Sequence, residues 1–99
     1  MLWWHDRRVA TYDFPPDLLQ LQRDWYAADA RCQEITASHP PALDVIAGTA
    51  TVTDEQHTEL KRARAERWDL TERLQRHRWW ATVDDVLDAK KELRAAAQR

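Results

Sequence analysis

Glycine and cysteine are nearly absent from this chain of 99 residues, which holds one of each, and its four prolines stand in two pairs. A single glycine rules out a glycine-rich phosphate-binding loop, and a single cysteine rules out a disulfide within the chain. Because the prolines are confined to positions 15, 16, 40 and 41, long stretches carry no residue that breaks a helix. The composition therefore predicts an all-α fold.

Long apolar runs and a strong net charge are also missing. No stretch approaches the roughly 20 apolar residues of a membrane-spanning helix, and the mean hydropathy is −0.79. The first residues form no apolar segment of signal-peptide length. The net charge of −2 argues against bulk attraction to nucleic acid or to an anionic membrane. We therefore expect a cytoplasmic protein that does not associate with membranes.

Residues that commonly carry chemistry form no recognisable group. The four histidines share no metal-ligand spacing with each other or with Cys32, and no serine or cysteine nucleophile motif occurs. The acidic pairs at 54–55 and 84–85 fit the first turns of helices, where the helix dipole favours anions. The sequence thus predicts no enzyme, no catalytic residue, no metal, no cofactor and no small-molecule substrate.

Two heptad patterns predict a long helical hairpin. In the first, apolar residues recur in alternating steps of three and four, the pattern of antiparallel bundles and coiled coils. Its members are Leu18, Leu21, Trp25, Ala28, Cys32 and Ile35. Pro16 suits the first turn of this helix and the second proline pair ends it, so we place the helix at 16–38. Trp25 is expected in the core.

The second helix of the hairpin is expected at 54–78. Thr53 and Gln56 form a capping-box sequence at its start. The seam then runs through Leu60, Ala63, Arg67, Leu70, Leu74 and His77. Arg67 stands where an apolar residue belongs. We expect its stem to lie along the core and its guanidinium to reach water or an acidic residue such as Asp24 or Asp29.

A shorter third helix is expected at 83–97, after a cap-like start at Thr82. Its seam contains Val83, Val86, Lys90, Leu93 and Ala97. The three helices predict an antiparallel bundle dominated by the long hairpin, with residues 16–99 as a single helical domain and residues 1–15 as an N-terminal arm. This arrangement brings Trp79 and Trp80 to the end of the bundle that holds Tyr12, Phe14 and the first proline pair. We therefore expect an aromatic cluster there.

The connection at 39–52 has turn residues at both ends and apolar residues between them. We expect Leu43, Val45 and Ile46 to fold over the end of the helical pair, with a short turn of helix at 42–47. The apolar residues at that end, where the third helix does not reach, must be covered by this connection or by another chain. A homodimer is accordingly expected.

The six tryptophans are far more than a chain of this length usually holds. Large aromatic side chains serve either as core anchors or as exposed binding groups. The predicted fold does not require Trp3 and Trp4, and it leaves Trp68 beside the seam. With Arg67, these three are the candidate partner-binding residues. The leading hypothesis is a small intracellular interaction or assembly module that binds itself or another protein.

The alternative hypothesis is a nucleic-acid-binding regulator that uses the stretch 61–78. Seven cations and three anions give this stretch a local charge of +4, with Trp68 inside it. Besides Arg67, the candidate phosphate contacts are Lys61, Arg62, Arg64, Arg73, Arg76 and Arg78. The competing interpretation is that cations gather late in a helix because the helix dipole favours them there.

Two short motifs resemble those of a group of small uncharacterised actinobacterial, Streptomyces-type helical proteins. They are the Tyr-Asp-Phe-Pro opening at 12–15 and the His-Arg-Trp-Trp sequence at 77–80. In that group a His-Pro-Phe-Trp type motif follows the second helix, so Arg78 stands where the group has proline. The resemblance implies the three-helix layout and an actinobacterial or actinophage origin. It implies no activity, cofactor or catalytic residue.

Overall fold

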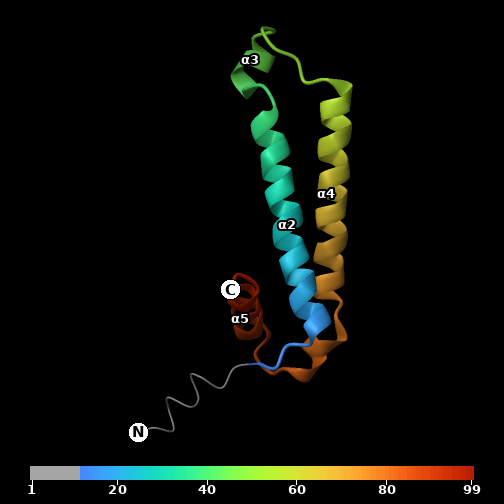
Figure 1. The fold of residues 1–99 in the computed structure, drawn as a ribbon, viewed down its shortest axis with the longest axis vertical. Coiled ribbons are helices and arrows are strands. Elements are labelled where there is room, and N and C mark those ends of the chain that lie inside the picture. The colour runs from blue at the N-terminus through green and yellow to red at the C-terminus, as the bar shows by residue number, and fades with distance from the viewer. Residues whose placement is uncertain (1–11) are drawn as a thin grey trace, which may run out of the picture.

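The computed structural model describes residues 12–99 of the chain (Figure 1). Within this range the elements are α2 (Pro16–Ser38), α3 (Ala42–Ile46), α4 (Asp54–Gln75), the 3₁₀ helix η1 (Arg78–Thr82) and α5 (Val86–Ala97), with no strand among the described residues. The all-α prediction and the first helix at 16–38 are confirmed. The predictions for Trp3 and Trp4 concern residues outside the described range.

The pair α2 and α4 forms a long antiparallel hairpin that sets the shape of the molecule (Figure 1). The fold extends over 64 × 28 × 19 Å, and its radius of gyration of 19.0 Å exceeds the roughly 13 Å of a compact chain of this length. In Figure 1, α5 lies beside α2 on the side opposite α4, and it packs against α2. The molecule is thus a rod with a base, where α5 lies, and a tip, where α3 lies.

A small buried cluster joins α2 and α4 in the half of the hairpin nearer the tip. Cys32, Ile35 and Ala63 form a buried cluster there, and Leu60 packs against it. All four belong to the predicted heptad seams. Since these side chains cover one another, the two helices close this end of the core without a third element.

Near the base the buried stripe of α2 differs from the predicted seam. Leu18 is fully buried, but Leu21 and Trp25 are only partly buried, so the prediction of Trp25 as a core residue is wrong. Gln22 is buried in their place, with 7% of its surface exposed. The reason is that α2 has two neighbours at this level, α4 and α5, and the buried surface spreads toward the second of them.

The second helix begins where predicted and ends three residues early. The Thr53 hydroxyl accepts a hydrogen bond from the backbone N–H of Gln56, whose side chain accepts one from the Thr53 N–H, so the capping box is confirmed. The helix ends at Gln75, however, and not at residue 78. His77 has an extended backbone, and the Trp80 indole donates to the carbonyl of Leu74, which satisfies an acceptor in the last turn.

The third helix starts at Val86, three residues later than predicted. Thr82 does not cap it, because its hydroxyl donates to the carbonyl of Trp79 inside η1. The cap is Asp85, whose carboxylate accepts from the N–H of Asp88. Residues 78–82 therefore form a turn of 3₁₀ helix at the corner between α4 and α5, and not the start of α5.

The predicted aromatic cluster is confirmed at this corner. The Trp79 ring centroid lies 5.2 Å from that of Phe14 and 6.0 Å from that of Tyr12, and the Trp80 ring lies 5.3 Å from Trp79. The Tyr12 hydroxyl also donates to a carboxylate oxygen of Asp88 at 2.6 Å. The segment before α2 is therefore fastened both to η1 and to the first turn of α5.

The connection at the tip contains the predicted short helix, α3, but does not cover the end of the hairpin. Leu43 and Ile46 are 79% and 82% exposed, and Val45 is exposed as well. The prediction that these residues fold over the helical pair is wrong, because the cluster around Cys32 is already closed by α2 and α4. Leu43, Val45 and Ile46 are called the tip patch below. Gly48, with φ of +78°, ends α3 in the left-handed conformation that glycine favours.

Candidate functional site

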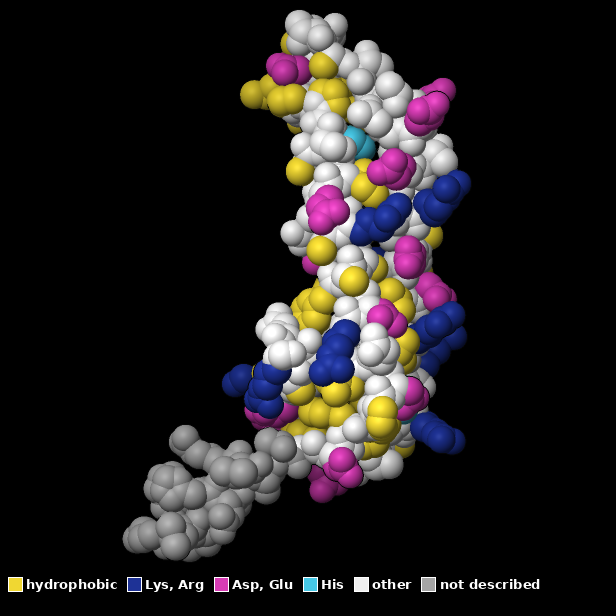
Figure 2. Space-filling model, in the orientation of Figure 1, with side chains coloured by type: hydrophobic (Ala, Val, Ile, Leu, Met, Phe, Trp, Pro, Cys, Tyr) yellow, Lys and Arg dark blue, Asp and Glu magenta, His cyan; other side chains and the backbone are white. Residues whose placement is uncertain are grey.

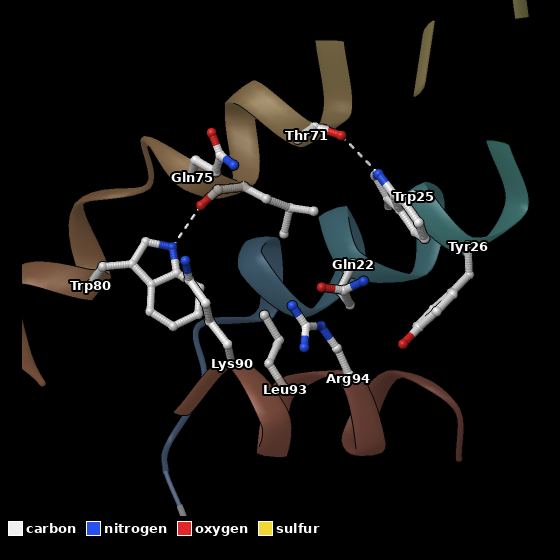
Figure 3. Close-up of a pocket in the computed structure, with 10 residues that line it drawn as sticks. Gln22, Trp25, Tyr26, Thr71, Gln75, Trp80, Lys90, Leu93 and Arg94 are labelled. Atoms are coloured by element: carbon white, nitrogen blue, oxygen red, sulfur yellow. Dashed lines mark hydrogen bonds between the residues drawn. The ribbon is translucent and has the colours of Figure 1, made fainter. Parts of the chain in front are cut away.

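A cleft opens at the base of the rod where α4 and α5 lie apart over the surface of α2 (Figure 3). It has a volume of about 450 Å³, within the range of clefts that hold a drug-sized group. Its lining comes from α2, α4, η1 and α5 and consists of Gln22, Trp25, Tyr26, Thr71, Leu74, Gln75, Trp80, Lys90, Leu93 and Arg94. Most of these side chains are drawn in Figure 3, with Trp80 at one end and Tyr26 at the other.

Trp25 is held in place between α2 and α4. Its indole N–H donates to the Thr71 hydroxyl at 2.8 Å, and that hydroxyl donates in turn to the carbonyl of Arg67 at 2.9 Å. The only polar atom of the indole is therefore satisfied within the fold, and what Trp25 offers to the cleft is the apolar part of its ring.

Trp80 is fixed in a similar way at the other end of the cleft. Its indole N–H donates to the carbonyl of Leu74 at 2.6 Å, and its ring packs against Trp79. The Lys90 ammonium lies 5.7 Å from the centre of the Trp80 ring, within the range of a cation–π interaction. The Trp80 ring and the positive charge of Lys90 thus lie side by side in the lining of the cleft.

Gln22 is the polar group at the floor of the cleft. Only 7% of its surface is exposed, and it lines the cleft. Its amide can offer a donor and an acceptor to a group bound there. The burial of Gln22 was not predicted, because a glutamine next to a heptad position gives no sign of burial.

The charged side chains of the lining are Lys90 and Arg94, and both are cations. They are four residues apart on α5, which places them about one turn from each other. Neither forms an ion pair within residues 12–99, and none of the lining residues is acidic. Lys90 stood at a predicted seam position of the third helix, and a cation at such a position is a signal in the sequence that could have pointed to this site.

Arg67 lies along the seam between α4 and α2, as predicted. Its guanidinium forms an ion pair with Asp29 of α2 at 2.6 Å, and the two side chains are 32% and 24% exposed. The fold therefore uses this guanidinium to join α2 and α4. Of the other candidate partner-binding residues, Trp68 is 62% exposed on α4, and Trp3 and Trp4 are outside the described residues.

The candidate phosphate contacts of α4 and η1 are all exposed, but acidic side chains stand among them. Arg73 pairs with Asp69 at 3.0 Å and Arg76 with Glu72 at 3.4 Å. Figure 2 shows dark blue and magenta side chains alternating along the α4 side of the rod. Of the candidate residues Lys61, Arg62, Arg64, Arg73, Arg76 and Arg78, Arg73 and Arg76 therefore each stand beside an acidic side chain of α4.

A second polar contact closes the corner next to the cleft. The Nδ1 atom of His77 accepts from the backbone N–H of Trp79 at 3.1 Å, so a neutral ring carries its proton on Nε2. This Nε2 lies 2.8 Å from a carboxylate oxygen of Asp17 and donates to it. The hydrogen bond from His77 holds the pKa of Asp17 below its usual value of 3.8.

The contact predicts an acid-sensitive part of the stability. Because the folded pKa of Asp17 is lowered, its contribution is fully present above the unfolded value of 3.8 and is lost as pH falls through the folded pKa. The gap in Tm between the wild type and Asp17→Asn, followed by circular dichroism, should be widest near neutral pH and should close as the pH falls below 3.8 and through the folded pKa of Asp17. Asp13→Asn is the control. A gap that stays constant with pH would contradict the assignment.

No group of three or more His, Cys, Asp or Glu side chains in the described part of the chain is placed to hold a metal ion. None of the helices between residues 12 and 99 is both long enough and apolar enough to cross a membrane.

The family comparison covers the whole hairpin and the third helix. The sequence profile of a domain of unknown function, DUF8825, matches residues 17–96, from the first turn of α2 to the last turn of α5. No curated protein and no solved structure matches the chain significantly. Because the match takes in most of the chain, including every residue that lines the cleft, the chain belongs to the DUF8825 family.

Proposed function

We propose that this chain is a small helical protein-interaction module whose cleft binds an apolar, acidic segment of a protein. The observation that carries the proposal is the lining of the cleft, where two tryptophan rings lie beside two cations and no acidic residue. Gln22 lies at the floor, and its amide adds a donor and an acceptor for a bound peptide.

The lining matches such a segment group by group. A glutamine amide offers a donor and an acceptor, the complement of the C=O and N–H of a peptide unit. Lys90 and Arg94 favour carboxylates, since no acidic residue of the lining competes for them. The rings of Trp25 and Trp80 present apolar surface to leucine-like side chains. Aromatic residues and arginine are also the groups that dominate binding energy at protein interfaces.

Cellular context and origin are part of the same proposal. The absence of long apolar runs supports a cytoplasmic module, and the motifs at 12–15 and 77–80 support an actinobacterial origin. The polar groups of the cleft are amides, hydroxyls and cations, which suit the binding of a peptide through hydrogen bonds and charge.

The test is a titration followed by nuclear magnetic resonance. The probe is a blocked peptide of sequence Glu-Leu-Asp-Leu-Glu, added to the full chain, and we expect shifts of the Gln22 side-chain amide and the Trp80 indole N–H. Arg94→Glu should weaken binding about tenfold, because it places a carboxylate opposite those of the peptide. Lys91→Glu is the matched control, since Lys91 is exposed on the same helix and does not line the cleft.

Three results would overturn the proposal: no shift at the cleft, equal binding of the peptide Lys-Leu-Lys-Leu-Lys, or equal loss in both variants. A single-stranded DNA oligonucleotide serves as a further arm. If it shifts the arginine resonances of α4 with a steep dependence on salt while the acidic peptide shifts nothing, the nucleic-acid alternative replaces the proposal.

A further inference from the structure

We propose that the occupant of the cleft is the tip of a second copy of this chain, so that molecules associate head to tail. The proposal rests on the function proposed for the cleft and names its partner. In one copy the tip patch on α3 enters the cleft of the next copy, where Asp44 faces Lys90 and Arg94. Three properties of the tip support this contact.

The first property is exposed apolar surface with no role inside the fold. Leu43 and Ile46 are 79% and 82% exposed and lie three residues apart, on one face of α3. On the face shown in Figure 2, hydrophobic side chains gather at this end of the rod. Moving these apolar side chains out of water is favourable, so the patch offers a driving force for association that the isolated molecule does not use.

The second property is a charge opposite to that of the cleft. From residue 39 to residue 60 the chain contains no lysine or arginine. Its acidic residues in this stretch, all exposed, are Asp44, Asp54, Glu55 and Glu59. Two tips would therefore repel each other, whereas a tip and a cleft attract. Charge complementarity thus favours a contact between two different surfaces over a symmetric contact of two tips.

The third property is the position of the tip relative to the cleft. The tip and the base lie at opposite ends of a rod 64 Å long, so a molecule cannot place its own tip in its own cleft. Each copy in a complex keeps one tip and one cleft available for further copies. A contact of this heterologous kind builds open chains unless the rotation between copies happens to close a ring.

The closing experiment uses two variants that are each unable to associate with themselves. The tip variant carries Leu43→Glu and Ile46→Glu, and the cleft variant carries Arg94→Glu. Light scattering after size exclusion should show the wild-type mass rising with concentration beyond that of a dimer, and each variant as a monomer. An equal mixture of the two variants should give a heterodimer and nothing larger, because only one intact tip and one intact cleft remain to meet.

A charge swap and a control keep the result interpretable. Asp44→Lys should be monomeric alone, and the double variant Asp44→Lys with Arg94→Glu should associate with itself, since the attraction between tip and cleft is restored with the signs exchanged. Leu87→Glu makes the same chemical change as the tip substitutions at a side chain that is 81% exposed on α5 and does not line the cleft. It should associate as the wild type does. Circular dichroism checks that each variant retains its helices.

A wild type that stays monomeric up to about millimolar concentration overturns the proposal, because attraction between complementary surfaces of this kind should be seen there. So does a wild type that associates while the two variants fail to combine, since the interface is then a different one. The peptide titration distinguishes the two proposals. If the acidic peptide shifts Gln22 and Trp80 but the copies do not combine, the cleft binds another protein and only the head-to-tail proposal fails.

Discussion

Replacing Leu93 with alanine is expected to lower the free energy of unfolding by about 3 kcal/mol. Leu93 is 1% exposed, and with Ala89 it forms the buried face of α5. Alanine leaves a cavity between α5 and α2, and this short helix has no other large buried side chain to compensate for the loss. Chemical denaturation monitored by far-ultraviolet circular dichroism measures the difference.

The matched control for this substitution is Leu87→Ala on the same helix. Leu87 is 81% exposed, so its truncation should change stability by about 0.5 kcal/mol or less. Both variants remove the same atoms and keep the same helix propensity, so that their difference reports packing alone. Equal effects of the two substitutions would show that α5 is not held on α2 by the contact described here. Leu93→Ala should also weaken peptide binding, since Leu93 lines the cleft.

The ion pair between Arg67 and Asp29 is expected to give the second largest effect. Arg67→Met keeps an unbranched side chain along the seam but leaves the carboxylate of Asp29 partly buried without its partner. We expect a loss of about 2 kcal/mol. The double substitution Arg67→Met with Asp29→Leu removes both charges and should recover most of that loss. The reason is that the loss of stability comes from the unpaired, partly buried Asp29 carboxylate and not from the absence of an ion pair.

A surface pair provides the comparison for this double-mutant cycle. Arg73 and Asp69 are 64% and 61% exposed, and Arg73→Met should change stability by about 0.5 kcal/mol or less. Denaturation curves of all variants at the same ionic strength give the coupling energies. If the double variant is as unstable as Arg67→Met alone, the loss of stability does not come from an unpaired Asp29 carboxylate. The ion pair itself then stabilises the fold.

Several features of the fold could be predicted because they depend on neighbours in sequence. The first helix, the capping box at Thr53 and the all-α class follow from the proline positions, the heptad steps and the cap residues, which act within a few residues of one another. The aromatic cluster at the base was predictable as well, since sequential antiparallel helices leave few places for Trp79 and Trp80.

The ends of the elements at the base could not be predicted, because they depend on contacts between segments distant in sequence. His77 continues the heptad pattern, yet it leaves the helix to bind Asp17, 60 residues earlier in the chain. The Trp80 indole then takes the carbonyl of Leu74, and the chain needs five residues of 3₁₀ helix before α5 begins. Helix propensity at 76–85 does not distinguish this path from a continuous helix.

The candidate site was the least predictable part of the molecule. A heptad pattern identifies the face that one helix turns toward one neighbour, and for α2 it selected Leu21 and Trp25. The second neighbour, α5, approaches from another direction and buries Gln22. The cleft therefore exists because two helices contact a third without closing on each other. No single segment encodes that arrangement.

The sequence by itself determined that this chain is helical, where its long helices lie and which residues hold the hairpin together near the tip. Those properties follow from the local periodicity of one chain segment and from its caps. Only the tertiary structure decided that α3 is left exposed, that Gln22 is buried at the floor of the cleft and that Lys90 and Arg94 share that cleft with two tryptophans. The physical reason is that the burial of a side chain depends on which other helices pack against it. That packing is set by contacts between segments that lie far apart in the sequence.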